Sequence, residues 1–163
     1  MLFEYLATLY YYNSWANAKI LLAAENLSNE QFVASAQHIG CGSLRATLVH
    51  IVSTEWIWRS RWQGKSPTMM LRNEDFPTLE ALRVRWSKEE RQTHAFLAAL
   101  SDEEVQRAVR YTTLQGEMHT ALLWQTMIHV VNHSTQHRSE AAAIESMLGY
   151  PPGNLDLLEF LHG

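Results

Sequence analysis

The chain has 163 residues, 47% of them hydrophobic, and a formal net charge of −4 with neutral histidines. This length and apolar content suit one domain with a core of its own. The single cysteine excludes an intrachain disulfide, and the acidic balance argues against nucleic acid as the main partner, because phosphate binding needs clustered lysine and arginine.

The chain also lacks the features of an exported or membrane protein. No uninterrupted apolar run approaches the roughly 18 residues that a membrane-spanning helix needs, so we expect no membrane span. Residues 1–6 lack the basic start and cleavage pattern of a secretory signal. Together with the lone Cys41, which fits a reducing compartment, these features predict a cytoplasmic protein.

The first half of the chain is predicted to be helical. Apolar residues recur at helical spacing over residues 5–24, a stretch without glycine or proline, and predict a long helix. Ser28 opens a capping box and so predicts a short helix. After a glycine-containing break at residues 40–42, a second long helix is predicted over residues 43–63, with its first serine as the N-cap.

The second half of the chain adds two more long helices. Residues 64–77 are polar and contain two prolines, and this connection is long enough to carry the chain along a whole bundle. A third helix is predicted over residues 78–100, with its first threonine as the cap. Residues 105–119 alternate weakly and allow a small hairpin. A fourth long helix is predicted over residues 120–148 and a helical turn over 154–161. Four long amphipathic helices in one domain indicate an all-α four-helix bundle.

A ladder of histidines occupies the fourth predicted helix. His129, His133 and His137 lie four residues apart, so they share one helical face. Two imidazoles at that spacing can bind one metal ion, but His129 and His137 lie about 12 Å apart along the axis, too far for both to bind the same ion. Spacing alone leaves 129/133 and 133/137 open. His50, in the second long helix, is the candidate ligand from elsewhere, because bundles build metal sites from different helices.

Four segments together carry a resemblance to a known family. They are Tyr-Asn-Ser-Trp-Ala-Asn at 12–17, the stretch around His50 at 48–58, the histidine ladder at 129–138, and Leu-Gly-Tyr-Pro-Pro-Gly-Asn-Leu-Asp at 148–156. In order and spacing they resemble the DinB (DinB/YfiT-like) family of metal-binding four-helix proteins, over nearly the whole of the single domain 1–163. The resemblance implies up-down-down-up helix order, with a long crossover between the second and third helices.

The resemblance also selects the ligands, which it implies are His50, His133 and His137. One departure from the family pattern lies next to them. Many relatives have Gly-Gln where this chain has Ser139-Glu140. Glu140 follows His137 by three residues and projects to the same side. It could support a ligand histidine, act as an extra ligand, or be a solvated helix residue; the last is the ordinary reading, because glutamate is rarely buried unpaired.

Other residues near the predicted site follow from helical spacing. Thr54 and Trp58 continue the stripe of His50 at four-residue steps, so we expect them to line a pocket beside the metal, with His129 as a neighbour of the ligands. Trp62 extends the same stripe. If that stripe is exposed, it forms an apolar patch of the kind that marks a partner surface. We therefore expect a homodimer, which also agrees with the family resemblance, whereas ordinary core packing is the simpler reading for Trp56.

Three neutral imidazoles without an obligatory fourth protein ligand describe an open metal site. Cys41 is an unsuitable fourth ligand, because it precedes His50 by nine residues, about 13 Å along a straight helix. An open position accepts water or a thiol. Ser134 stands where the zinc-protease motif has its glutamate base. A thiolate needs little further base, so the pattern favours thiol chemistry over hydrolysis.

These observations lead to a functional prediction. We expect one divalent ion per chain, zinc or nickel, because imidazole suits both. The DinB resemblance implies enzymes that use low-molecular-weight thiols, and we predict a metal-dependent transferase that activates such a thiol for S-transfer to a small electrophile. A metal-dependent hydrolase is one alternative, and a non-catalytic metal-binding stress-response protein is the other.

Overall fold

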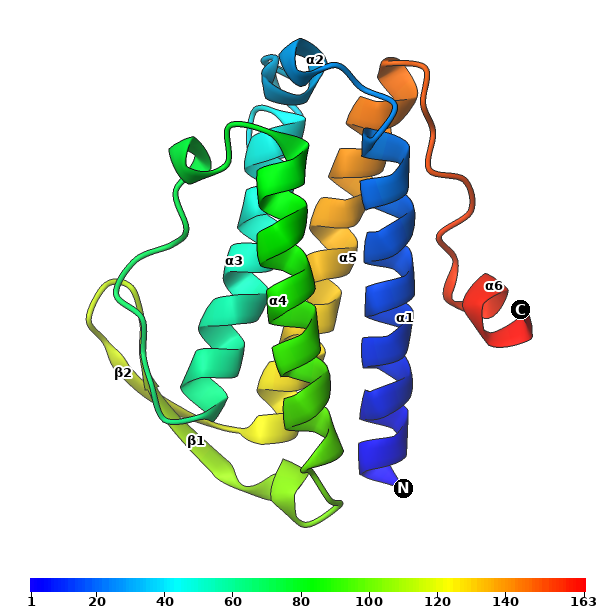
Figure 1. Ribbon diagram of the computed structural model, residues 1–163. Helices are drawn as coiled ribbons and strands as arrows, with labels where there is room; N and C mark the ends of the chain where they lie inside the picture. The colour runs from blue at the N-terminus through cyan, green and yellow to red at the C-terminus, as the bar shows by residue number, and fades with distance from the viewer.

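The structure is a computed structural model that describes all residues from Met1 to Gly163. Four long helices run side by side (Figure 1), and they are α1 Leu2–Ala24, α3 Leu44–Trp62, α4 Leu79–Ala98 and α5 Leu123–Met147. The shorter helical elements are α2 Asn29–Val33, η1 Asn73–Asp75, η2 Glu104–Gln106 and α6 Leu157–His162. The predicted four long helices are therefore confirmed. None of the helices combines the length and apolar character that crossing a bilayer requires.

A small antiparallel hairpin corrects the all-α prediction. Strand β1, Ala108–Thr112, pairs with β2, Met118–Leu122, at the end of the bundle where α5 begins. Gly116 supplies the positive φ of the connecting turn. The expected hairpin at 105–119 thus exists but lies three residues further along, and β2 takes the residues that helical periodicity assigned to the start of α5.

The predicted helix caps are present. The Ser43 hydroxyl accepts a hydrogen bond from the Ala46 N–H at 3.0 Å and begins α3. Ser28 makes its capping box at the start of α2, and Thr78 caps α4. Because Ser43 sets where α3 begins, it also sets the height at which His50 projects from the bundle.

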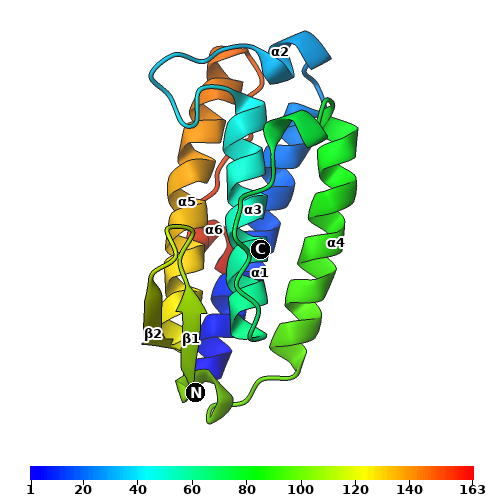
Figure 2. The same cartoon turned by 90° about the vertical axis from the view of Figure 1, so that its left-hand side faces the viewer.

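Side-chain pairs show the direction of α4 relative to α3. Arg59 forms an ion pair with Glu89, and further along both helices Trp62 stacks on Phe96 at 5.5 Å between ring centroids. The two pairs occur in the same chain order, so α3 and α4 run in the same direction. The connection over residues 63–78 must therefore return along the bundle, as Figure 2 shows.

The returning connection packs against α3. The Leu71 N–H donates to the Ser53 hydroxyl at 2.9 Å, and Phe76 is buried with the apolar residues of α3 and α4. The polar connection between α3 and α4 is thus in contact with the bundle, and it covers part of α3.

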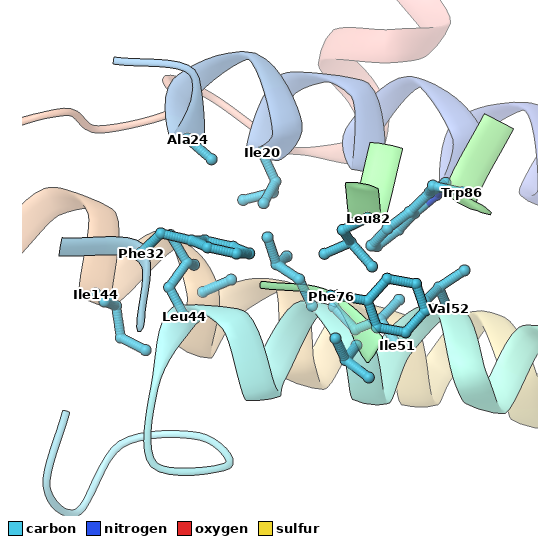
Figure 3. Close-up of a cluster of buried hydrophobic side chains, with 13 residues drawn as sticks. Ile20, Ala24, Phe32, Leu44, Ile51, Val52, Phe76, Leu82, Trp86 and Ile144 are labelled. Atoms are coloured by element: carbon cyan, nitrogen blue, oxygen red, sulfur yellow. The ribbon is translucent and has the colours of Figure 1, made fainter. Parts of the chain in front are cut away.

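The core consists of two apolar clusters at different heights of the bundle. The first cluster joins α1, α2, α3, α4 and α5 around Phe32, Leu82 and Trp86 (Figure 3), and Phe76 lies in it as well. The second cluster surrounds the hairpin end of the bundle, and it contains Leu6, Tyr10, Trp58, Trp62, Leu97, Leu100, Val105, Val109, Leu123, Met127, Val130 and Val131.

A buried polar layer separates the two clusters. Along each helix it falls between the residues of one cluster and those of the other, and its members are Asn13, Asn17, Glu55, Ser134 and Arg138. Glu55 accepts hydrogen bonds from both asparagine amides, at 2.7 and 3.1 Å, and from the Ser134 hydroxyl at 3.2 Å. Arg138 donates to both asparagine carbonyls. Because buried polar groups need these partners, the layer sets the relative heights of α1, α3 and α5.

Candidate metal centre

Two histidines from different helices face each other across the α3–α5 contact. The Nε2 atoms of His50 and His133 lie 3.0 Å apart. Two imidazole nitrogens that share a tetrahedral ion lie about 3.3 Å apart, given metal–nitrogen bonds of about 2.0–2.1 Å. With one nitrogen protonated, the same distance is a hydrogen bond. The fold therefore brings these rings to the separation that a shared ion needs.

His137 completes a cluster of three rings, which we call the histidine cluster: His50, His133 and His137. Its ring centroid lies 4.5 Å from that of His50 and 4.4 Å from that of His133. All three side chains are half-buried, so the cluster lies at the surface of the bundle between α3 and α5 and is open to solvent on one side.

Glu140 orients His137 through a direct hydrogen bond. Its Oε2 atom lies 2.6 Å from Nδ1 of His137. A carboxylate on Nδ1 holds the proton there and leaves the lone pair of Nε2 for a ligand. The reading of Glu140 as a solvated helix residue is therefore wrong. The i, i+3 spacing indicated the correct side of the helix, and the structure shows the direct contact.

The electrostatic surroundings keep His133 neutral. Burial, followed by the neighbouring His137, His50 and His129, lowers the pKa of His133 to about 4. Burial and then His137 also lower the pKa of His50. The Nδ1 atom of His133 is buried without a hydrogen-bond partner, so the only side-chain hydrogen bond of this ring is the one to His50. Neutral rings whose nitrogens are not consumed by other partners fit a divalent ion.

Cys41 also lies at this site, contrary to the prediction. Its sulfur, one ring nitrogen of His50 and one of His137 all lie within 4.8 Å of one another. The expected separation of about 13 Å is wrong because it extends a straight helix through residues that are not helical. Residues 40–42 instead form a turn with positive φ at both glycines, and the Cys41 N–H donates to the Thr47 hydroxyl at 3.1 Å. The Gly-Cys-Gly sequence indicates a break before α3, but the return of this turn over α3 depends on tertiary contacts.

The residues expected to line a pocket take different positions. Trp58 is buried, with its ring 5.4 Å from that of His129 and 4.9 Å from that of Tyr111. His129 is exposed, and its ring lies 6.0 Å from that of His133. Thr54 is buried one turn from His50 and makes no hydrogen bond to the histidine rings. The row of aromatic rings therefore continues from the histidine cluster towards the hairpin.

A groove lies at the far end of this row of rings. It has a volume of about 460 Å³ and is lined by Ser66, Arg110, Tyr111, Thr112, Met118, His119 and Thr120. None of the three clustered histidines lines it. The groove was not foreseen, because Tyr111 and its neighbours come to this place only through the pairing of β1 with β2.

The tryptophan stripe that continues from His50 is not exposed. Trp58 and Trp62 both belong to the second apolar cluster. Trp56 is half-buried, with the Arg85 guanidinium 5.3 Å from its ring centroid. Core packing thus applies to Trp58 and Trp62 rather than to Trp56, because the stripe of His50 turns inward where α3 meets the hairpin end of the bundle.

Comparisons with known proteins agree with this architecture. The sequence model of the DinB family matches residues 1–163. No curated protein matches the chain by sequence. Among solved structures the chain is similar to YfiT from Bacillus subtilis, with a TM-score of 0.66, 17% sequence identity, and coverage of 90% of this chain and 89% of that chain. That protein is described as a probable metal-dependent hydrolase with an unusual four-helix bundle topology. At this level of identity the likeness shows the fold.

Proposed function

The chain belongs to the DinB family, and from this premise we propose that it is a metal-dependent enzyme whose His50, His133 and His137 bind one divalent ion, zinc or nickel. The observation that carries the proposal is the 3.0 Å approach of two ring nitrogens from different helices, with the third ring beside them. The description of YfiT as a metal-dependent hydrolase supports a metal-dependent activity in this fold.

The residues at this site have different roles. His50 and His133 present neutral rings from α3 and α5, and Glu140 keeps the proton of His137 on Nδ1. The half-buried position of the rings leaves one side open for a small molecule. When bound, a divalent ion supplies Lewis acidity that favours the deprotonated form of a thiol or water beside it.

The surroundings of the cluster favour a thiol as the nucleophile. Ser134, at the position of the glutamate in zinc proteases, is fully buried and donates its hydroxyl to Glu55. Glu140, the carboxylate that contacts the cluster, already holds His137. Neither residue offers a free base for hydrolysis, and a thiolate needs none once its proton has gone to solvent.

We therefore propose S-transfer from a low-molecular-weight thiol to a small electrophile. The sulfur forms a bond to the electrophilic carbon, and the leaving group departs with the bonding pair. Hydrolysis is the second candidate, and the description of YfiT is what favours it. A non-catalytic metal-binding role is the third reading, and it predicts bound metal without turnover.

A fluorescent conjugation assay tests this function. Protein loaded with zinc or nickel is incubated with monochlorobimane and bacillithiol, mycothiol or glutathione, and adduct formation is followed. We expect metal-dependent conjugation that disappears in His133→Ala and persists in His162→Ala, which changes an exposed histidine. Elemental analysis, on protein purified without a metal-affinity tag, should find about one divalent ion per chain.

The same samples separate the alternatives. Conjugation that survives in His133→Ala or after chelation contradicts the proposal. Metal-dependent cleavage of activated esters without conjugation identifies a hydrolase instead. Bound metal with neither reaction indicates a non-catalytic protein.

A further inference from the structure

We propose that Cys41 closes the metal site, with its thiolate as a fourth protein ligand to the ion held by the histidine cluster, and that an incoming small thiol takes its place. This inference rests on the metal site proposed above. It starts from the donor geometry, since the Cys41 sulfur lies within 4.8 Å of ring nitrogens of both His50 and His137.

The distances require only a small adjustment. A sulfur and a nitrogen that share a tetrahedral zinc ion lie about 3.6 Å apart, given bonds of about 2.3 Å and 2.0–2.1 Å. The sulfur therefore needs to approach the ring nitrogens of His50 and His137 by about 1.2 Å or less. The Cys41 side chain is exposed and has room to rotate. On binding, the sulfur–metal bond forms, the thiol proton goes to solvent, and no group is oxidised or reduced.

The turn that carries Cys41 is packed against the site. Gly40 has φ +54° and Gly42 has φ +90°, values that favour glycine. A Cβ atom on Gly40 would lie 2.5 Å from the Thr47 hydroxyl oxygen and 3.4 Å from Glu140. The turn thus approaches α3 and α5 at the residue that orients His137, and the same contacts place the sulfur beside the rings.

Because Cys41 is exposed, its side chain is freer to move than the histidine rings. The rings project from two long packed helices, whereas Cys41 lies on a turn between α2 and α3. Its sulfur can leave the ion without moving either helix. A small thiol offers the same donor atom, so it can replace Cys41 by ligand exchange.

Cobalt substitution tests whether Cys41 is a ligand. Metal-free full-length protein is titrated with Co²⁺, and the near-ultraviolet sulfur-to-cobalt charge-transfer band is recorded. Because Cys41 is the only cysteine, a band in the wild-type protein that is absent in Cys41→Ser identifies it. The zinc affinity of Cys41→Ser should fall by about tenfold or more, since even residues behind the ligands contribute that much. Gly40→Ala, which retains the thiol but crowds the turn, should weaken the band.

The outcomes distinguish this inference from the proposed function. One equivalent of cobalt bound without the band, and with equal affinity in Cys41→Ser, overturns the role of Cys41 and leaves the histidine site standing. No cobalt binding by the wild-type protein overturns both.

Alkylation tests the exchange step. Zinc should protect Cys41 from iodoacetamide, as measured by mass spectrometry, and added glutathione should restore labelling while zinc stays bound. Labelling that stays blocked with glutathione in excess over the protein, and with iodoacetamide in excess over glutathione, rules out replacement of Cys41 by the incoming thiol.

Discussion

At the scale of single residues, the contact between Glu140 and His137 shows how a helix residue supports a candidate ligand. The Oε2 atom of Glu140 accepts a hydrogen bond from Nδ1 of His137 at 2.6 Å between the two atoms, and this bond orients the ring towards His50. The DinB resemblance implies glutamine at this position in many relatives. A glutamine carbonyl can accept the same hydrogen bond but lacks the negative charge. Replacement by glutamine therefore separates the effect of the hydrogen bond from that of the charge.

Variants at this position should rank by hydrogen bonding. We expect Glu140→Ala to weaken zinc binding about 10- to 100-fold, and Glu140→Gln to weaken it less, because the amide still accepts from Nδ1. Competition with a chromophoric chelator measures both affinities. Ser139→Ala, an exposed neighbour on the same helix, is the matched control. Equal zinc affinity in wild-type and Glu140→Ala protein would show that this hydrogen bond does not support a ligand.

Glu145 is a second residue with an unusual environment. Its side chain is 0% exposed, and both carboxylate oxygens lack a hydrogen-bond partner. Burial raises its pKa from 4.5 to about 8. The folded protein therefore holds this proton over a pH range in which the unfolded chain has lost it. The stability that the neutral carboxyl contributes is fully present below about pH 4.5 and is lost as the pH rises to about 8.

Replacement by the neutral isostere should remove this pH dependence. The quantity to compare is the unfolding free energy of Glu145→Gln minus that of the wild-type protein. We expect this difference to increase by at least about 1 kcal/mol from pH 5 to pH 8, since a pKa shift of one unit corresponds to about 1.4 kcal/mol. Urea unfolding of metal-free protein at both pH values measures the difference, in which histidine titration cancels. Exposed Glu103→Gln serves as the control. A wild-type-to-variant difference that stays constant with pH would contradict the assignment.

At the scale of elements, a buried ion pair joins the two helices that run in the same direction. Arg59 of α3 and Glu89 of α4 have side chains that are 8% and 3% exposed, and Arg85 adds a second contact to Glu89 at 2.7 Å. Each buried charge is stabilised by its partner. Removing one partner therefore lowers the unfolding free energy more than removing both.

We expect Glu89→Leu to lower the unfolding free energy by about 3–5 kcal/mol, because the Arg59 guanidinium stays buried without its partner. The double variant Arg59→Met/Glu89→Leu should recover most of that loss. Urea denaturation of the three proteins and of Arg59→Met completes the cycle. Additive single effects would mean that the two side chains do not interact energetically.

Element boundaries were predictable where local chemistry decides them. Ser28, Ser43 and Thr78 cap their helices at the predicted positions, because a cap depends on residues within one turn. The start of α5 was not predictable in the same way. Residues 120–122 were predicted as the first residues of this helix, but pairing with β1 places them in a strand. That choice depends on a partner strand, so it lies outside a local pattern.

At the scale of the whole molecule, the histidine cluster joins two helices that the polar layer already holds at matching heights. Ser134 lies next to His133 in the chain and donates to Glu55 of α3, so the layer and the cluster share the α3–α5 contact. An ion at the cluster would bind only the folded arrangement, because the unfolded chain separates His50 from the ladder.

Metal should therefore stabilise the folded protein. At zinc concentrations about 100-fold above the dissociation constant we expect about 2.7 kcal/mol of added stability, or about 5 to 10 °C in Tm. Differential scanning fluorimetry with zinc and with chelator measures the shift. His133→Ala should show no shift, and His162→Ala should behave as the wild-type protein. A wild-type Tm that is the same with zinc and with chelator would leave the histidine site without support.

The homodimer stays a prediction at this scale. The buried positions of Trp58 and Trp62 remove the exposed stripe that was one ground for it, and the family resemblance remains the other. We expect sedimentation equilibrium to give a mass of twice 18.8 kDa. A single species of 18.8 kDa across micromolar concentrations would show that the protein is a monomer.

The sequence by itself determined the four long helices, their caps, the long connection and the histidines worth considering, because these features depend on periodicity and on neighbours within a few residues. Its resemblance to the DinB family anticipated which three histidines would lie together. Only the tertiary structure decided that the turn at Cys41 folds back over α3, that Glu140 contacts His137, and that Trp58 and Trp62 lie inside. Each of those contacts joins segments by packing or by a non-helical turn, and no local pattern records where such segments meet.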